Sequence, residues 1–342
     1  MSEKKERIIL DAAFQPQVRT ETDTRRLMLD VIIALMPALI VAVLQFGVHV
    51  LLVVCCSVVS AVFWEWGYRK LFHKETSIGD LSAVVTGLLL AMTLPPTAPW
   101  WIAPIGTLFG IVVVKQLYGG IGKNFLNPAL AGRAFLLSSY ALIMANWSIP
   151  NALSGTVDGT TMATPLAGLY SGTMPAYFDV NHLFMGYIPG SIGEISTLAI
   201  LIGGGYLIYR NVISWRIPVS FIGTVAIVTL LSGREGFGHF DWMVYNLFSG
   251  SMVFGAFFMA TDYATSPVTL NGQLLYGVGC GLLTVLIRYF GGFPEGTTYA
   301  ILIMNLCTWA IDKGFHRHQF GVSKEDIAAA KAAKKAAKEA AK

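Results

Sequence analysis

Ten apolar stretches, several of them shorter than a full membrane crossing, make up about half of the 342-residue sequence. A membrane-spanning helix needs roughly 20 mainly apolar residues, and it satisfies its backbone polar groups internally. Charged residues make up only 13% of the chain, whereas about a quarter is usual in soluble domains. We therefore predict an all-α polytopic membrane protein with about ten transmembrane helices. The stretches are Leu27–Gln45, Val48–Gly67, Leu81–Leu94, Trp100–Lys115, Pro128–Asn146, Ile195–Tyr209, Ile217–Leu231, Val244–Thr261, Leu274–Tyr289 and Thr298–Ile311.

The positive charges predict which side of the membrane each segment faces. Lys and Arg gather at the N-terminus, in short loops and in the C-terminal tail, whereas residues 147–194 contain neither. Cytoplasmic segments carry the excess of Lys and Arg, so both termini are predicted to lie in the cytoplasm of a bacterial inner membrane. The resulting segments are a cytoplasmic N-terminus (1–26), a first membrane repeat (27–146), an external loop (147–194), a second membrane repeat (195–312) and a basic cytoplasmic tail (313–342). The basic tail suits lipid headgroups and is not a nucleic-acid signal.

An internal repeat relates the two membrane segments. GLLLAMTLPPTAP from Gly87 and GAFFMATDYATSP from Gly255 have Gly, Thr, Thr and Pro at the same offsets. The copies are five spans apart, and an odd number implies opposite orientations, hence two inverted five-helix repeats. Such repeats place binding sites near the membrane midplane, where broken helices expose backbone groups. The alternative is a chance match between short apolar strings.

Several longer motifs carry a family resemblance. The segment VDGTTMATPLAG from Val157 would be no more than a turn by composition. It occurs in order with GLLLAMTLPPTAPWW, GGIGKNFLNPALAGRAF, GSIGEIS, ISWRIP, ATDYATSPVT and FPEGTTYAILIMN. Together these motifs resemble the RnfD/NqrB family, which contains the D component of the Rnf ion-translocating oxidoreductase complex and the B component of the sodium-pumping NADH:quinone reductase. The modest length and short N-terminal segment favour the Rnf branch.

The resemblance implies a covalent flavin. Residues 158–164 are similar to the flavinylation motif of this family, matching at Asp158, Thr161, Ala163 and Thr164, while Met162 stands where Gly or Ser is usual. Thr164 is then the residue that receives FMN through a phosphodiester bond. The acceptor hydroxyl should be exposed on a flexible loop, where a flavin transferase can reach it.

A second flavin site is implied by GGIGKNFLNPALAGRAF. In the quinone reductase this segment resembles a non-covalent riboflavin site, so Asn124, Asn127 and Pro128 are candidate ligand-binding residues here. The alternative is structural, with Asn124, Asn127 and Arg133 capping a broken helix, because unsatisfied polar groups at membrane depth are costly.

Other polar residues near the spans have both structural and functional interpretations. Ser191 and Gly193 open the sixth span and suit either the FMN phosphate or an ordinary helix cap. Asp262 and Glu295 are candidates for an ion path, since ionisable residues within membranes are often functional. For Glu65, near Arg69 and Lys70, an interfacial ion pair is the simplest expectation. The Cys and His residues have no metal-ligand spacing, and we assign no metal and no catalytic residue.

The family resemblance implies a membrane component of an ion-translocating oxidoreductase that passes electrons through FMN. It would couple ferredoxin and NAD redox chemistry to Na⁺ or H⁺ transport, together with the A, B, C, E and G components of the Rnf complex. The chain contains no nicotinamide or iron–sulfur motif, so it should not be a complete enzyme alone. The alternatives are a solute channel or permease without flavin, and a purely structural membrane subunit.

Overall fold

The computed structural model describes residues 23–148, 164–171, 180–233, 238–291 and 295–315, and the regular elements in these ranges are all helices. The prediction of an all-α protein is confirmed. Asp158, Thr161 and Ala163 lie outside the described residues, as do the N-terminal 22 residues and most of the basic tail.

The first half of the chain forms eight helical elements. They are α1 (Thr24–Phe46), α2 (His49–Leu71), the 3₁₀-helix η1 (Ile78–Asp80), α3 (Ser82–Met92), α4 (Ile102–Leu108), the π-helix η2 (Phe109–Gln116), α5 (Pro128–Ser139) and α6 (Ala141–Met144).

The second half begins with two short helices and continues with longer ones. Its elements are α7 (Pro165–Ser171), α8 (Val180–Met185), α9 (Thr197–Tyr209), α10 (Arg216–Ser232), α11 (His239–Phe248), α12 (Met252–Phe254), the π-helix η3 (Gly255–Met259), α13 (Leu270–Phe290) and α14 (Thr297–Gly314). Each of the ten predicted stretches therefore overlaps at least one helix.

Helix length separates full crossings from shorter elements. Among the described residues, the three helices α1, α2 and α13 are long and apolar enough to cross a membrane. The number rises to four if α11 and Met252–Met259, which meet at a bend of 61°, are counted together as one span. The helix α3 has 11 residues. Its length is therefore about 16 Å at 1.5 Å per residue, half of a bilayer core of roughly 30 Å. The chain is thus a multi-pass membrane protein that combines long helices with short apolar ones.

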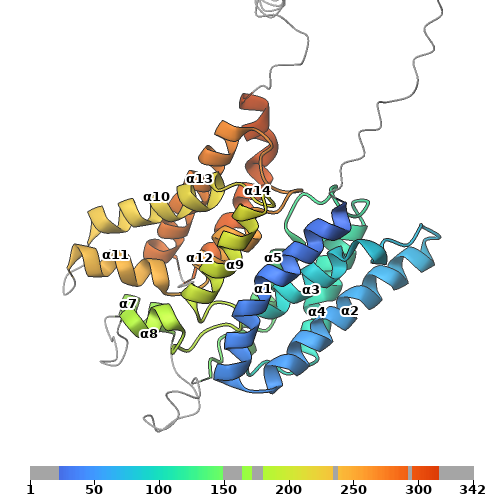
Figure 1. Cartoon of the computed structure of the whole chain (residues 1–342), viewed down its shortest axis with the longest axis horizontal. Helices are drawn as coiled ribbons and strands as arrows, with labels where there is room; N and C mark the ends of the chain where they lie inside the picture. Colours follow the sequence, from blue (N-terminus) through green and yellow to red (C-terminus); the bar gives the residue numbers. More distant parts are fainter. Residues whose placement is uncertain (1–22, 149–163, 172–179, 234–237, 292–294, 316–342) are drawn as a thin grey trace, which may run out of the picture.

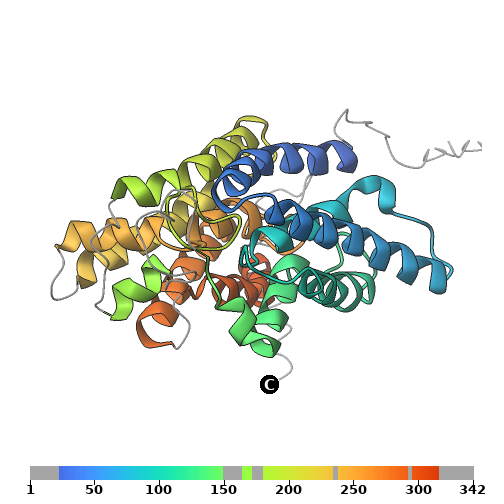
Figure 2. The ribbon, with the colours of Figure 1, turned by 90° about the horizontal axis from the view of Figure 1, so that it is seen from below.

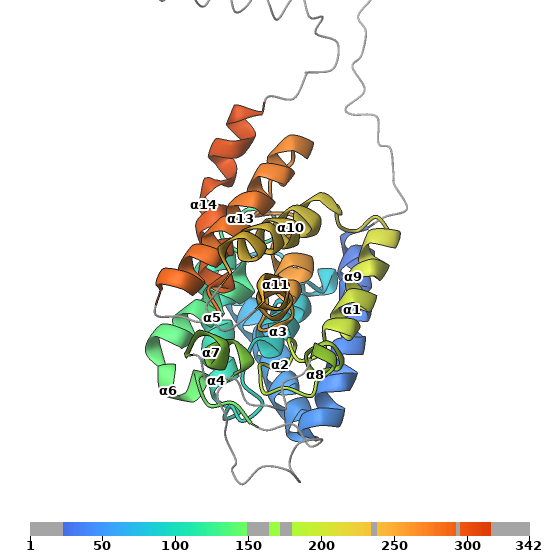
Figure 3. The ribbon, with the colours of Figure 1, turned by 90° about the vertical axis from the view of Figure 1, so that its left-hand side faces the viewer.

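The two halves meet side by side (Figure 1). The helices α1 to α5 gather on one side and α10, α11 and α13 on the other, with α9 packed along α1 at the boundary. The view from below shows the same contact between the blue first helix and the yellow-green α9 (Figure 2). The start of α1 and the end of α14 lie at one end of the molecule, and α6, α7 and α8 lie at the opposite end (Figure 3).

Small residues bring α1 and α9 close together. A Cβ atom added at Gly203 of α9 would lie 2.0 Å from the carbonyl oxygen of Ala34 in α1. Small residues at helix contacts are the usual means of close packing in membranes, where lipid is as apolar as the side chains. The helices α1 and α9 are therefore in direct contact, with no side chain between their backbones at Gly203.

Both halves contain a break next to a π-helix or a proline. The helix α3 ends at Met92 and is followed by Pro95 and Pro96, which cannot donate the backbone hydrogen bonds that a continuing helix needs. In the second half, η3 ends at Met259, and regular structure resumes only at Leu270. π-Helical turns are rare in proteins as a whole, but those that occur are frequently located at functional sites. The space between these two breaks is therefore a candidate site.

Candidate functional site

A cavity of about 520 Å³ lies between the two halves. Its walls come from α1, α3, the segment 121–129, the residues around the end of α9, and η3 with the residues that follow it. This volume is within the range of about 300–1,000 Å³ that is typical of small-molecule sites, and the mostly apolar wall with few polar groups is also typical. The polar lining residues are Thr24, Ser82, Thr86, Lys115, Asn124, Asn127, Thr261 and Asp262.

The segment that leads into α5 owes its shape to glycine. Gly119, Gly120 and Gly122 have φ values of 115°, 97° and 79°, a region that residues with a Cβ rarely adopt. A Cβ at Gly120 would also lie 2.7 Å from an Arg69 guanidinium nitrogen. These glycines turn the chain back after η2, so that the following asparagines reach the cavity wall.

Asn127 performs two structural tasks. Its Oδ1 accepts hydrogen bonds from the backbone N–H groups of Ala129 (3.0 Å) and Leu130 (3.3 Å), which caps α5. Its Nδ2 donates to the carbonyl oxygen of Met259 in η3 at 3.1 Å. Asn127 is buried, and Pro128 follows it as the first helical residue, where the missing N–H costs nothing. The helix-capping interpretation of Asn127 is confirmed, and the same residue also lines the cavity and joins the two halves.

We expect Asn127→Ala to destabilise the folded chain by about 0.5–2 kcal/mol, because the cap of α5 is lost. Asn127→Ser is the matched variant, since Ser retains an acceptor for the cap but cannot reach Met259. Unfolding in mixed detergent micelles, followed by circular dichroism, measures both. Equal losses in the two variants would mean that the bond to Met259, not the cap, carries the effect.

Asn124 and Arg133 flank Asn127. The Nδ2 of Asn124 donates to the carbonyl of Leu126 at 3.0 Å, and Asn124 and Asp262 both line the cavity. Arg133 is six residues beyond Asn127 on α5, a rise of about 9 Å along the helix. It is 2% exposed, and it binds Glu295 instead of facing the cavity.

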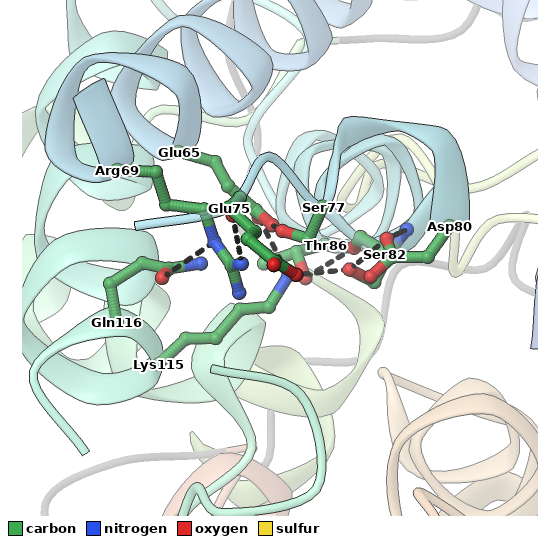
Figure 4. A network of polar contacts seen from close by, with 9 residues as sticks. All are labelled: Glu65, Arg69, Glu75, Ser77, Asp80, Ser82, Thr86, Lys115 and Gln116. Carbon is green, nitrogen blue, oxygen red and sulfur yellow. Dashed lines mark hydrogen bonds and ion pairs between the residues drawn. The ribbon is translucent and has the colours of Figure 1, made fainter. Parts of the chain in front are cut away.

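Lys115 and Glu65 form a buried ion pair on the cavity wall (Figure 4). The Lys115 Nζ lies 2.7 Å from Glu65 Oε2 and 2.6 Å from Ser82 Oγ. Glu65 is 0% exposed, and Ser77 donates to its other oxygen. The expectation of an interfacial pair with Arg69 or Lys70 is wrong, because the residue that pairs with Glu65 comes from η2, 50 positions further along the chain.

Arg69 lies in the same network with different partners. Its Nε donates to Gln116 Oε1 at 3.2 Å, and its Nη1 donates to the backbone carbonyl of Glu75. Figure 4 shows these groups around the carboxylate of Glu65, with Asp80 at the far edge, where it accepts from Ser82. The network therefore holds the Lys115 side chain at the cavity wall.

The second half contributes Asp262 and an aromatic surface. Thr265 donates to Asp262 Oδ2 at 3.0 Å, and Phe257, Phe258 and Tyr263 line the cavity beside it. Asp262 thus lines the same cavity as Lys115. The cavity presents a carboxylate, an ammonium group and two amides to a ligand that otherwise contacts apolar atoms.

Thr164 stands beside α7, at the opposite end of the molecule from the start of α1 and the end of α14. It immediately precedes α7, and its carbonyl accepts from the N–H of Gly168 at 3.0 Å. Leu166 and Leu169 of α7 pack against Trp242. Thr164 is 6% exposed, contrary to the expectation of an exposed acceptor, because α7 docks on α11. In this conformation the Thr164 side chain is therefore largely shielded from solvent.

Ser191 and Gly193 have partners within the chain. Ser191 Oγ donates to Glu194 Oε2 at 2.7 Å, and the N–H of Gly193 donates to the carbonyl of Met92 at 2.6 Å. The cap of α9 is supplied by Ser196, whose Oγ accepts from Ala199 N. The segment before α9 thus donates backbone hydrogen bonds to the carbonyl groups at the end of α3 in the first half. Its contact with a phosphate group stays a prediction.

Sequence reasoning overlooked Asp30. This carboxylate lies in α1 within a predicted span, is 7% exposed, and accepts a hydrogen bond from Tyr206 of α9 at 2.8 Å. Arg210 lies 3.5 Å from its other oxygen. The sequence contained a signal for this site, namely an acidic residue inside an apolar stretch. Such residues are rare within membrane spans, and they face other protein groups.

These features define a multi-pass α-helical membrane protein with a mostly apolar cavity, carrying a few polar groups, between its halves. The chain belongs to the NQR2, RnfD, RnfE family, whose model matches residues 12–321.

Three relatives illustrate the match, and each is the D component of its complex. The chain is 48% identical over 320 residues to that of the Na(+)-translocating ferredoxin:NAD(+) oxidoreductase complex of Acetobacterium woodii, covering 92% of this chain and 96% of the relative. It is 42% identical over 325 residues to that of the proton-translocating ferredoxin:NAD(+) oxidoreductase complex of Clostridium ljungdahlii, covering 92% and 97%. It is 35% identical over 333 residues to that of the ion-translocating oxidoreductase complex of Actinobacillus succinogenes, covering 87% and 94%.

Proposed function

We propose that this chain is the D component of an ion-translocating ferredoxin:NAD⁺ oxidoreductase complex in the membrane and relays electrons through FMN bound covalently to Thr164. The observation that carries the proposal is the family match over residues 12–321, which spans the cavity and Thr164. The chain acts with the A, B, C, E and G components of an Rnf-type complex, and a flavin transferase attaches the cofactor. It is part of an oxidoreductase and not a complete enzyme by itself.

The residues around Thr164 suit a tethered flavin. The helix α7 docks on an aromatic surface in which Trp242 Nε1 donates to the Tyr289 hydroxyl at 2.8 Å and Tyr170 donates to Asn246 at 2.9 Å. Attached FMN supplies one- and two-electron chemistry, while the protein fixes its position and surroundings. A covalent bond to Thr164 prevents the carrier from diffusing away.

The cavity suits a second, non-covalent flavin such as riboflavin. Asn124, Asn127 and Pro128 line it, as do Phe257 and Phe258. Amide groups suit the polar edge of a flavin, and the phenyl rings suit its flat faces. On this proposal, α5 links the two flavin regions, because it starts at the cavity and carries Arg133 towards the end of the molecule that contains Thr164.

The finer topology is also proposed. Ten spans in two inverted repeats would place both termini in the cytoplasm of a bacterial inner membrane and the Thr164 loop outside. Support comes from the common end at which α1 begins and α14 ends, opposite α7 and α8. Further support comes from Gly87 and Gly255, at equivalent repeat positions, where an added Cβ would lie within 3 Å of a neighbouring helix or its side chain.

The transported ion is left open by this proposal. One relative is named as Na⁺-translocating and another as proton-translocating. Asp262, at the cavity, and Glu295, bound to Arg133, are the candidate ion-path residues of this chain.

Thr164→Val tests the covalent flavin. We expect the denatured wild-type band to fluoresce under ultraviolet light when a flavin transferase is present in the cells, and the Thr164→Val band to be dark, because valine has no hydroxyl to form the phosphodiester. Thr164→Ser is the matched control and should retain part of the fluorescence. Acid extraction of the Thr164→Val protein should still release non-covalent flavin from the cavity.

Each failure has a distinct meaning. A dark wild-type band without extractable flavin contradicts the flavin relay and favours a solute channel or permease. A fluorescent Thr164→Val band moves the attachment site to another residue. Unchanged electron transfer through the complex with Thr164→Val would favour a purely structural role for this chain.

A further inference from the structure

Four charged side chains, three of them buried and one partly exposed, meet at the end of the molecule that contains α7. They are Arg133 from α5, Glu194 before α9, Arg288 from α13 and Glu295 before α14. Arg133 binds Glu295 through Nη2, and Ser251 donates to the same carboxylate oxygen at 3.3 Å. Arg288 donates to the backbone carbonyls of Asn246, Ser249 and Glu295.

Glu194 has no guanidinium partner within ion-pair distance among the described residues. Its Oε2 accepts from Ser191, and its Oε1 lies against Gly190, where a Cβ would approach it to 2.8 Å. Glu194 is 2% exposed, whereas the side chain of Glu295 is 18% exposed. Glu295 is thus paired with Arg133 and is partly exposed, whereas Glu194 is buried and has no such partner among the described residues.

The cluster contains polar atoms without a partner. Among the described residues, the buried Arg133 Nε and Glu295 Oε1 make no hydrogen bond, although Arg133 is 2% exposed and its Nη2 is already bound to Glu295. A free donor and a free acceptor on the same ion pair fit a small species that can both accept and donate, as water or a hydrated proton does.

The electrostatics of Glu194 agree with this geometry. Burial, together with the neighbouring Glu295 carboxylate, raises the pKa of Glu194, which lies outside the membrane-spanning helices, to about 7, while Arg133 opposes the increase. The other charged group facing it is Arg288, across the cluster. A carboxyl group with this pKa changes its protonation near neutral pH.

We propose that Glu194 and Glu295 form a proton-binding site, in which Glu194 holds the proton as a neutral carboxyl group and Glu295 is paired with Arg133. Binding is a single protonation of the Glu194 carboxylate, exchanged with the surface through Glu295. A metal cation fits less well, because the site contains two guanidinium groups and two of its four carboxylate oxygens already accept hydrogen bonds. The proposal does not depend on a bound flavin.

Infrared spectroscopy of the full chain tests the site directly. We expect the C=O stretch of a protonated buried carboxyl group in wild type at acid pH, lost with a midpoint near pH 7. Glu194→Gln should remove this band. Glu295→Gln should move the midpoint to lower pH, because a neighbouring negative charge is removed. The exposed Glu75→Gln is the matched control and should change nothing.

Three results would overturn the proposal: no such band in wild type at any pH, a band that persists in Glu194→Gln, or a band that Na⁺ displaces when it replaces K⁺ at constant ionic strength. A wild type without the band contradicts the proposal even if a variant fails to fold. Repeating it in Thr164→Val separates this site from the proposed flavin, since the band should persist there.

Discussion

Replacing Lys115 by methionine should destabilise the folded protein by about 3–5 kcal/mol, because removing one partner of a buried ion pair leaves the other charge uncompensated. Glu65 would remain 0% exposed, with only the hydroxyl of Ser77 as a hydrogen-bond partner. The carboxylate must then take up a proton or distort the packing between α2, α3 and η2. Unfolding in mixed micelles, monitored by the loss of helical circular dichroism, measures the change.

Two further variants distinguish the effect of breaking the Glu65–Lys115 ion pair from the effect of removing any lysine. Lys74→Met removes an exposed lysine of the neighbouring loop and should change stability by no more than about 0.5 kcal/mol. Glu65→Gln combined with Lys115→Met removes the stranded charge and should recover much of the loss. If Lys115→Met is as mild as Lys74→Met, the ion pair does not exist in the native protein.

Gly203→Ala should weaken the contact between α1 and α9 by about 1–3 kcal/mol, the usual cost of overpacking a close contact. The added Cβ would lie 2.0 Å from a backbone oxygen of α1, which cannot rotate away as a side chain would. The two helices must separate, and Tyr206 and Asp30, which bond across this contact, must separate with them.

Gly205→Ala is the matched control in the same helix. A Cβ at Gly205 meets nothing within 4 Å. Alanine is a better helix former than glycine by roughly 1 kcal/mol, so this variant should be neutral or slightly stabilising. The two substitutions are therefore expected to have opposite signs in the same unfolding assay. A loss of equal size in both would show that helix propensity or insertion, not the contact with α1, controls the result.

Local features of this protein were predictable because they depend on neighbouring residues. Apolar stretches of helical length located the helices. The sequence Asn127-Pro128 predicted the start of α5, because the Asn127 side chain caps the first turn and the first helical position does not need the backbone N–H that proline lacks. The prolines after Met92 likewise predicted where α3 ends. In each case the hydrogen bonds involved join residues only a few positions apart.

Other features were outside the reach of local patterns. The π-helical turns of η2 and η3 arise inside apolar sequences that read as ordinary helix, and the bend of 61° between α11 and α12 falls within a stretch predicted as one span. The burial of Thr164 depends on the docking of α7 against Trp242, far along the chain. Composition gives no information about which helix faces will meet.

By itself, the sequence determined the all-helical membrane class, the family, and most places where helices start and stop, because backbone hydrogen bonding and apolar length are local properties. Only the tertiary structure decided the partners of the buried polar groups. Glu65 pairs with Lys115 across 50 positions, Asn127 with Met259 across 132, and Arg133 with Glu295 across 162. A buried charge needs a partner, but packing of the whole bundle selects which one, and in this protein those selections create the cavity and the proposed proton site.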